Sequence, residues 1–196
     1  MRHIKEVETR IMGRCKQQAP RSALGCLSCS DAFGVVSKPL QKQIWTAART
    51  HLLSQKFAKN QHVAAEHGFG SVAVGAYKCN IYVAHSAVEG GAAVPTINGF
   101  LLKKDPPRAS QWAGVEDTDP GIAGLQVNLA GWHNPDTSSN PEPGIVISYG
   151  GAPGHCGILD CDGFGLSASS DDDPPLNIVT RRLNIRMANI YRFPSP

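Results

Sequence analysis

Three short apolar segments in the last third of the chain constrain the fold more than any other feature. They cover residues 145–149, 155–159 and 164–169. Spacers rich in Gly, Pro and Asp separate them, and such spacers favour tight turns between antiparallel strands. Residues 176–193 supply one or two further strands. The sequence therefore predicts an antiparallel sheet built from consecutive segments.

Two helical patterns precede these strands. Residues 40–60 place apolar side chains on one helical face and polar side chains opposite. A second pattern has Cys79 at or just before its first turn and stops at Gly90-Gly91, as expected just past a helix C-terminus. Helices followed by antiparallel strands predict an α+β fold with the N-terminal helices packed on the sheet. The apolar face of the first helix consists of Ile44, Trp45, Ala48, Leu52 and Phe57.

The length and charge of the chain favour a single globular domain over a nucleic-acid-binding or membrane-spanning protein. The 196 residues suffice for one sizeable core, so we expect one domain over residues 39–196 and an arm or extension over residues 1–38, where periodicity is weak. A formal net charge of +3 is too small to indicate nucleic-acid binding. No apolar run approaches the roughly 20 residues that span a bilayer, and the basic, polar start lacks the apolar core of a signal peptide. We expect synthesis in the cytoplasm without a signal peptide and no membrane span.

Residues 95–142 form a long region rich in Pro, Gly, Asn and Asp. Loops of this length usually carry function or lack order, and the two tryptophans within it favour an ordered segment that forms a groove. Trp112 and Trp132 either pack this segment or stack on a substrate. Trp112 is retained as a candidate substrate-binding residue.

Cys79 and His155 are the candidate catalytic pair. A thiolate is the reactive form of cysteine, and a helix N-terminus together with an adjacent imidazolium lowers the thiol pKa from about 8.5. The imidazole needs a third group to orient it. Ser167, on the neighbouring predicted strand, is the first candidate, and Asp160 and Asp162 are the acidic alternatives. Spacing alone also permits a structural thiol and a core histidine.

The other cysteines and histidines predict no metal or cofactor site. Cys26 and Cys29 form a lone C-x-x-C without the second ligand pair that zinc requires. Cys156 and Cys161 are interpreted as core or hairpin thiols, with a mutual disulfide as the alternative. His85 is interpreted as a packed or solvated helix residue. The remaining histidines near the nucleophile, for which we also expect no metal, are His51, His62 and His67.

The motifs around the candidate pair resemble those of NlpC-type papain-like cysteine peptidases, which hydrolyse peptidoglycan. The matching stretches are YKCNIYV, EPGIVISY and GHCGILD. The chain is more specifically similar to the amidase effectors of bacterial type VI secretion, through Val94-Pro95, Asn98-Gly99 and an Ala-Ser-Gln-Trp-Ala step over residues 109–113, in that order. The resemblance covers residues 45–193 and departs from the family at Lys78, at Asn80 and at Gly144-Ile145. An exposed Lys78 is expected to contribute little to the thiolate.

The resemblance implies an α+β papain-like fold and a Cys-His amidase. It implies Cys79 as nucleophile, His155 as general base and Ser167 as orienting residue, with Tyr77 lining the groove. The implied substrate is the stem peptide of peptidoglycan, reached in the periplasm of a target cell after secretion. A cognate immunity protein and a secretion-tube or spike component are the implied partners. The alternatives are a protease, deamidase or acyltransferase acting on proteins, and a degenerate module that only binds the cell wall.

Overall fold

The part of the chain described below belongs to the second of two units, which are divided between Val35 and Val36. The computed structural model describes residues 38–98, 104–113, 129, 131–133, 142–149, 154–160, 164–168, 179–184 and 190–194. Residues 1–37 lie outside this part, so the expected arm over residues 1–38 stays a prediction. No described helix has the length and apolar character needed to cross a membrane.

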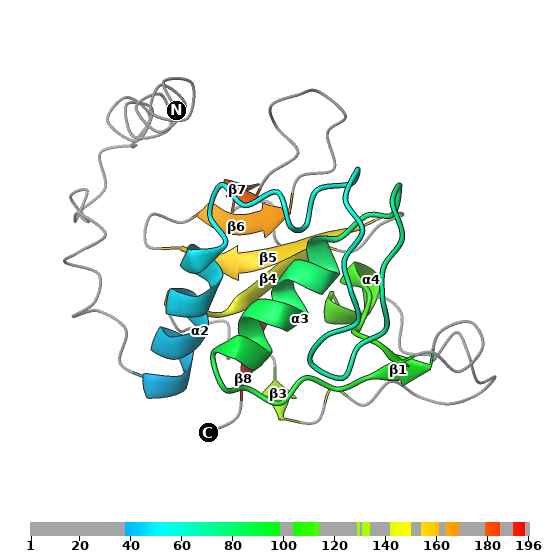
Figure 1. The fold of residues 1–196 in the computed structure, drawn as a ribbon. Helices are drawn as coiled ribbons and strands as arrows, with labels where there is room; N and C mark the ends of the chain where they lie inside the picture. Colours follow the sequence, from blue (N-terminus) through cyan, green and yellow to red (C-terminus); the bar gives the residue numbers. More distant parts are fainter. Residues whose placement is uncertain are drawn as a thin grey trace, which may run out of the picture. The chain divides into compact units, whose positions relative to one another are not determined.

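Helices and an antiparallel sheet make up the fold, as the sequence predicted (Figure 1). The helices are α2 (Pro39–Thr50), α3 (Cys79–Glu89) and α4 (Ala109–Trp112). The larger sheet has the order β3-β8-β4-β5-β6-β7, and β1 (Ile97–Asn98) pairs with β2 (Lys104–Asp105) in a small separate sheet. The strands of the larger sheet are β3 (Trp132–His133), β4 (Val146–Tyr149), β5 (His155–Leu159), β6 (Phe164–Ala168), β7 (Val179–Asn184) and β8 (Ile190–Pro194).

The central strands follow one another in sequence, and every pair is antiparallel. Strand β4 pairs with β5, β5 with β6 and β6 with β7. Short connections suffice between β4 and β5 and between β5 and β6, because neighbouring antiparallel strands can be joined by a hairpin. Strand β8 returns to pair with the free edge of β4 and also with β3. The C-terminal segment thus supplies two strands, β7 and β8, where the sequence predicted one or two.

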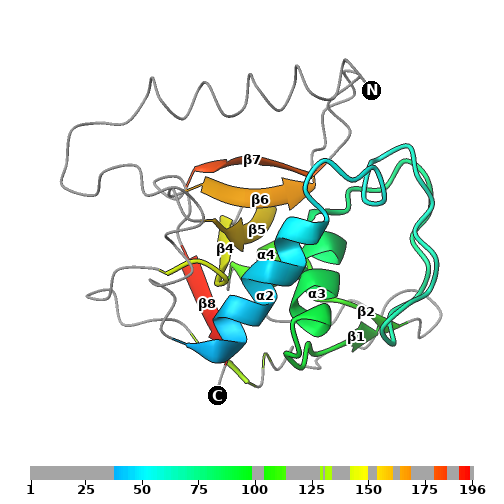
Figure 2. The ribbon, with the colours of Figure 1, turned by 60° about the vertical axis from the view of Figure 1, so that its left-hand side comes forward.

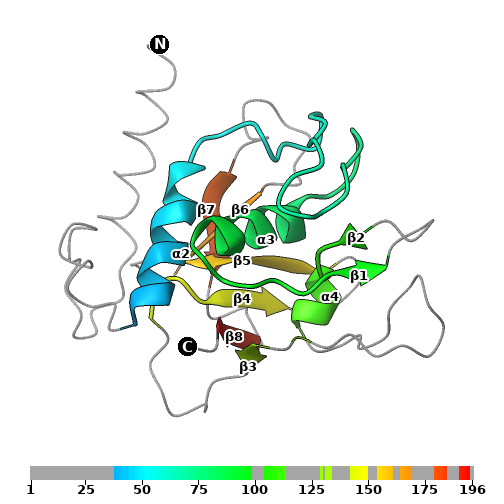
Figure 3. The same ribbon diagram turned by 60° about the horizontal axis from the view of Figure 1, so that its bottom comes forward.

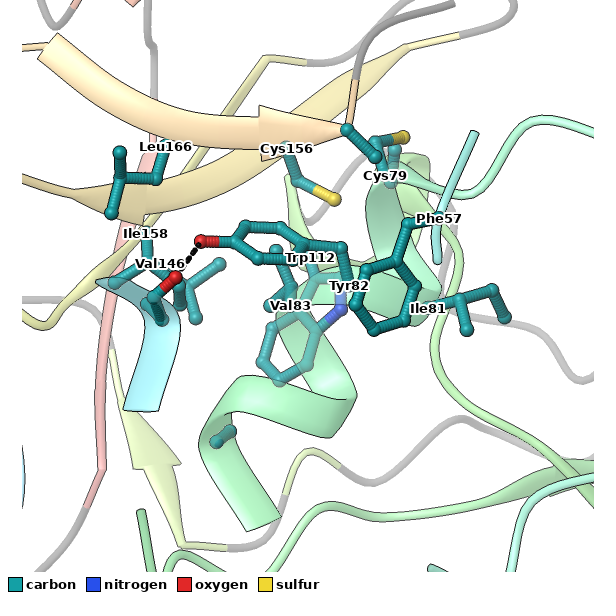
Figure 4. Close-up of a cluster of buried hydrophobic side chains, with 14 of the residues drawn as sticks. Phe57, Cys79, Ile81, Tyr82, Val83, Trp112, Val146, Cys156, Ile158 and Leu166 are labelled. Atoms are coloured by element: carbon teal, nitrogen blue, oxygen red, sulfur yellow. Dashed lines mark hydrogen bonds between the residues drawn. The ribbon is translucent and has the colours of Figure 1, made fainter. Parts of the chain in front are cut away.

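Helix α3 lies against the middle of this sheet, and α2 packs beside it (Figures 1 and 2). Eight of the eleven residues of α3 are buried, which fits its run of small and apolar side chains. The two helices approach closely because Gly90, just after α3, lies against the backbone of Ile44, where a Cβ would overlap it. The Tyr82 hydroxyl of α3 donates a 3.1 Å hydrogen bond to the Ala48 carbonyl of α2 (Figure 4).

Helix α2 is shorter than the sequence pattern predicted. It ends at Thr50, and the next N–H groups bond to carbonyls three residues back, which tightens the chain into turns. Leu53 has a left-handed φ of 66°, which cannot continue a helix. The expected helical positions Leu52 and Phe57 still contact the core, but from turns. The prediction of a longer helix was wrong because the spacing of apolar residues shows which side chains are buried. Side chains on turns can be buried at the same spacing as side chains on a helix.

Hydrogen bonds from Trp45 and Arg49 to the buried Asp160 connect α2 to the end of β5. The Trp45 indole N–H donates a 2.7 Å hydrogen bond to Asp160 Oδ1, and Arg49 Nη1 lies 3.0 Å from the same oxygen. Asp160 is fully buried, whereas Arg49 is one-third exposed. Trp112 of α4 and Trp132 of β3 pack against each other edge to face, with 5.0 Å between their ring centres. Figure 3 shows α4 beside the β4 and β5 end of the sheet.

Candidate active site

Cys79 is the first residue of α3, where the sequence placed it. Its side chain is 6% exposed, and it belongs to the core cluster that joins α3 to the sheet (Figure 4). The first N–H groups of a helix have no acceptor within the helix, and the aligned peptide dipoles leave partial positive charge there. A thiolate at this position is therefore stabilised by the helix itself.

Lys78 differs from the expectation of an exposed lysine. It is 3% exposed, and its ammonium donates to the carbonyls of Lys59 at 3.2 Å and Ala76 at 3.0 Å. Burial lowers its pKa. Lys78 therefore ties the turn around Lys59 to the segment that leads into α3.

His155 opens β5 and meets Ser167 of the adjacent strand β6. The Ser167 hydroxyl oxygen lies 2.8 Å from His155 Nε2. Strands β5 and β6 approach closely here because residue 157 is glycine; a Cβ there would lie 2.5 Å from the Leu166 carbonyl oxygen and 3.2 Å from Ser167 Cβ. Gly157 therefore helps to bring the serine within reach of the imidazole.

The hydrogen bonds of Ser167 fix the tautomer of His155. The hydroxyl has a single proton, and it donates this proton to the Cys156 carbonyl over 2.7 Å. The same oxygen must then accept from His155, so Nε2 carries a proton. This leaves Nδ1 as the basic nitrogen of a neutral His155, and His155 forms a hydrogen bond with Cys79. Cys79 and His155 are thus neighbours, and Nδ1 is the nitrogen of the neutral ring that can accept a proton.

Hydrogen bonds stabilise the thiolate of Cys79 and hold its pKa well below the usual range. The largest cause is a hydrogen bond from the Cys156 thiol; burial opposes it, and His155 and the Cys156 backbone N–H act in the same direction as that thiol. Burial, followed by the neighbouring Cys79, raises the pKa of Cys156. Cys156 was expected to be a core or hairpin thiol, and it is fully buried. The sequence did not predict its contact with Cys79, and its place directly after the candidate base was the only signal.

The structure does not bring Asp160 to His155. Asp160 follows the last residue of β5, whereas His155 is the first, and five residues of strand span roughly 16 Å. The carboxylate of Asp160 instead accepts hydrogen bonds from Trp45 and Arg49. Asp162 and Cys161 lie outside the described residues. Of the two described candidates for the third position, Ser167 and Asp160, Ser167 is the one in contact with the imidazole.

The two candidate substrate-binding residues differ in exposure. Tyr77, two residues before Cys79, is 52% exposed, and Lys59 Nζ lies 5.2 Å from the centre of its ring. Trp112 is fully buried against Trp132. The structure therefore favours packing for Trp112 and leaves Tyr77 as the aromatic group available to a substrate.

Comparisons of this chain with protein-family models, curated proteins and solved structures found no match.

Proposed function

We propose that this chain is a cysteine amidase of the papain-like NlpC type that hydrolyses the stem peptides of peptidoglycan. The observation that carries the proposal is the contact of three groups from three elements: Cys79 at the start of α3, His155 at the start of β5 and Ser167 on β6. A nucleophile on a helix that packs on an antiparallel sheet carrying its base is the arrangement expected of a papain-like fold. The stem-peptide substrate is inferred from the sequence resemblance.

The proposed reaction proceeds through a thioester. His155 accepts the Cys79 proton at Nδ1 while Ser167 holds Nε2, and the thiolate attacks the amide carbonyl. The Cys79 backbone N–H, which has no acceptor within α3, is the natural first donor to the oxyanion. His155 then returns the proton to the leaving amine, and water hydrolyses the thioester with the same residue as base. A serine supplies no negative charge, so its contribution is to fix the tautomer and the ring orientation.

The biological setting follows the same resemblance. We propose that the chain is secreted and acts in the periplasm of target cells as an antibacterial effector. An immunity protein that covers the site and a component of the secretion tube or spike would be its partners. Tyr77 would line the groove for the peptide.

The decisive experiment is mass spectrometry of purified muropeptides after incubation with the full chain. We expect new free amine and carboxyl ends within the stem peptide. Cys79→Ala should abolish them, and Cys15→Ala, which removes a cysteine from the segment that the sequence resemblance does not cover, should not. Intact muropeptides together with cleavage or modification of protein substrates would favour the protease, deamidase or acyltransferase alternative. Binding to peptidoglycan without new ends would favour the degenerate module.

A further inference from the structure

A second polar cluster lies beside α3, away from Cys79. Its centre is His85, which is six residues further along the helix and 1% exposed. Nδ1 of His85 is buried and makes no hydrogen bond within the described part of the chain. It faces the Glu66 carboxylate, whose Oε2 lies 3.3 Å away. A buried ring nitrogen without a hydrogen bond is costly, so a group that satisfies it would stabilise the fold.

A tight turn brings two more potential ligands to the same place. Glu66 forms an isolated bridge with Phe69, and His67 and Gly68 between them both have positive φ. This turn directs the adjacent side chains of Glu66 and His67 toward α3. The rings of His67 and His85 meet edge to face, with 4.8 Å between their centres.

The three side chains are close enough to share one ion. One ligand atom from each of Glu66, His67 and His85 lies within 4.8 Å of the other two. Zinc bonds to nitrogen and oxygen of about 2.1 Å place tetrahedral ligands roughly 3.4 Å apart. The His85–Glu66 separation already has this value. The site would close by movement of the more exposed partners, Glu66 and His67.

We propose that Glu66, His67 and His85 bind a zinc ion that fixes the irregular segment 51–78 to α3. Two imidazoles and one carboxylate form a donor set that zinc commonly uses. Glu89, one turn after His85 on α3, places Oε1 3.4 Å from His67 Nε2 and therefore orients this ligand. The other oxygen of Glu89 lies 2.6 Å from His51 Nε2, so the orienting carboxylate is itself held.

Lys56 is the group that a metal ion must displace. Its ammonium lies 2.6 Å from Glu66 Oε2, the oxygen that faces His85. The Lys56 side chain is one-third exposed, so it can turn into solvent when a divalent ion replaces it. The salt bridge of Glu66 and Lys56 thus occupies the ligand atom in the absence of metal.

The test is zinc binding by the full chain in a background of Cys26→Ser and Cys29→Ser, which removes the C-x-x-C thiols. After removal of metal by a chelator, we expect equilibrium dialysis against Zn²⁺ to give one bound ion that His67→Ala abolishes. His62→Ala should leave it intact, because His62 is an exposed histidine outside the cluster. Since His67 is itself partly exposed, loss of binding in His67→Ala can be separated from unfolding by circular dichroism.

Cobalt substitution identifies the ligands. We expect the visible spectrum of a tetrahedral Co²⁺ site without a thiolate-to-cobalt charge-transfer band, and we expect His85→Gln to remove this spectrum. Lys56→Gln should tighten zinc binding several-fold, because it removes the competing ammonium. Unchanged stoichiometry in His67→Ala, a thiolate band in the cobalt spectrum, or no tightening in Lys56→Gln would each overturn the proposed ligand set.

Discussion

Two polar clusters lie along α3, and they differ in whether their polar atoms have hydrogen-bond partners. The first cluster consists of Cys79, His155 and Ser167, and the second of Glu66, His67 and His85. At the first residue of α3, Cys79 meets His155, and Ser167 bonds both to the imidazole and to a carbonyl. Six residues further along the helix, His85 keeps a buried ring nitrogen that has no hydrogen bond to any described residue. The arrangement of the first cluster suits the proton transfer proposed above. The unpartnered nitrogen of the second cluster suits the proposed binding of a metal ion.

The two clusters also differ in the secondary structure that holds their side chains. His155 and Ser167 are fixed by paired strands, whose register leaves little freedom. Glu66 and His67 stand on a turn within a segment that has only isolated bridges besides its turns and bends. A catalytic pair requires a fixed geometry before the substrate arrives. A metal site can instead acquire its geometry on binding, because the ion contributes folding free energy.

The largest expected effect comes from removing one central residue of each cluster. Cys79→Ala should lower muropeptide hydrolysis by a factor on the order of 10⁴ or more, because the nucleophile is lost. The same variant should keep the zinc stoichiometry of the unmodified chain. His67→Ala should lose zinc and keep alkylation of Cys79 by iodoacetamide. Kinetics, dialysis and alkylation of the same preparations measure the three properties.

Loss of zinc binding in Cys79→Ala would contradict the separation of the two clusters, because it would indicate that the thiol is a metal ligand. Full hydrolysis in Cys79→Ala would remove the catalytic role of the first cluster. Cys15→Ala is the matched control for both measurements.

The first cluster was largely predictable because its signals are local. Small residues at helical spacing after Cys79 and the apolar run after His155 identify a helix start and a strand start. The sequence alone could not select Ser167, since it left Asp160 and Asp162 as alternatives. The pairing of β5 with β6 is what places the serine at the imidazole. The contact of Cys156 with Cys79 depends on how α3 packs on β5, which no spacing in the sequence records.

The second cluster was not predicted, and the sequence favoured no metal there. Glu66 and His67 come from a segment without helical or strand periodicity, and His85 lies in a different element. Their proximity depends on a tight turn with positive φ at His67 and on the end of α2 at Thr50. Both are tertiary outcomes: the apolar residues after Thr50 matched a longer helix equally well.

The next largest effect tests whether Asp160 serves the fold or the site. Asp160→Ala should lower the free energy of unfolding by about 3 kcal/mol, because it leaves the Trp45 indole and the Arg49 guanidinium without their carboxylate. Asp160→Asn keeps an acceptor and should cost about 1 kcal/mol. Urea denaturation measures both values. A fall in hydrolysis per folded molecule in Asp160→Asn as large as that in Ser167→Ala would assign the orienting role to Asp160.

Ser167→Ala should reduce kcat/KM about 10- to 100-fold, a smaller effect than loss of the nucleophile. The change removes the acceptor that holds His155 Nε2, and the loss of this one bond costs about 1–3 kcal/mol. It also removes the donor to the Cys156 carbonyl, which acts on the fold and not on the reacting groups. Ser167→Thr retains a hydroxyl and should restore most of the rate. Steady-state kinetics on one purified muropeptide measures both variants. Equal rates for Ser167→Ala and the unmodified chain would show that His155 needs no orienting serine.

The smallest expected effect concerns Cys156 and the acidity of Cys79. The Cys156 thiol donates the hydrogen bond that most lowers the Cys79 pKa, so Cys156→Ala should raise this pKa. Alkylation by iodoacetamide follows the thiolate, and its rate falls as the pH drops through the pKa of the folded protein. The rate–pH curve of Cys156→Ala should therefore move to higher pH, with up to a roughly tenfold lower rate at a fixed pH on the acid limb.

Cys156→Ser is the matched control, because its hydroxyl can donate the same bond and should keep the curve near that of the unmodified chain. A curve that stays in place in Cys156→Ala would show that the helix terminus and His155 suffice to form the thiolate. Cys156 would then belong to the core alone, and the first cluster would depend only on groups whose positions the sequence predicted.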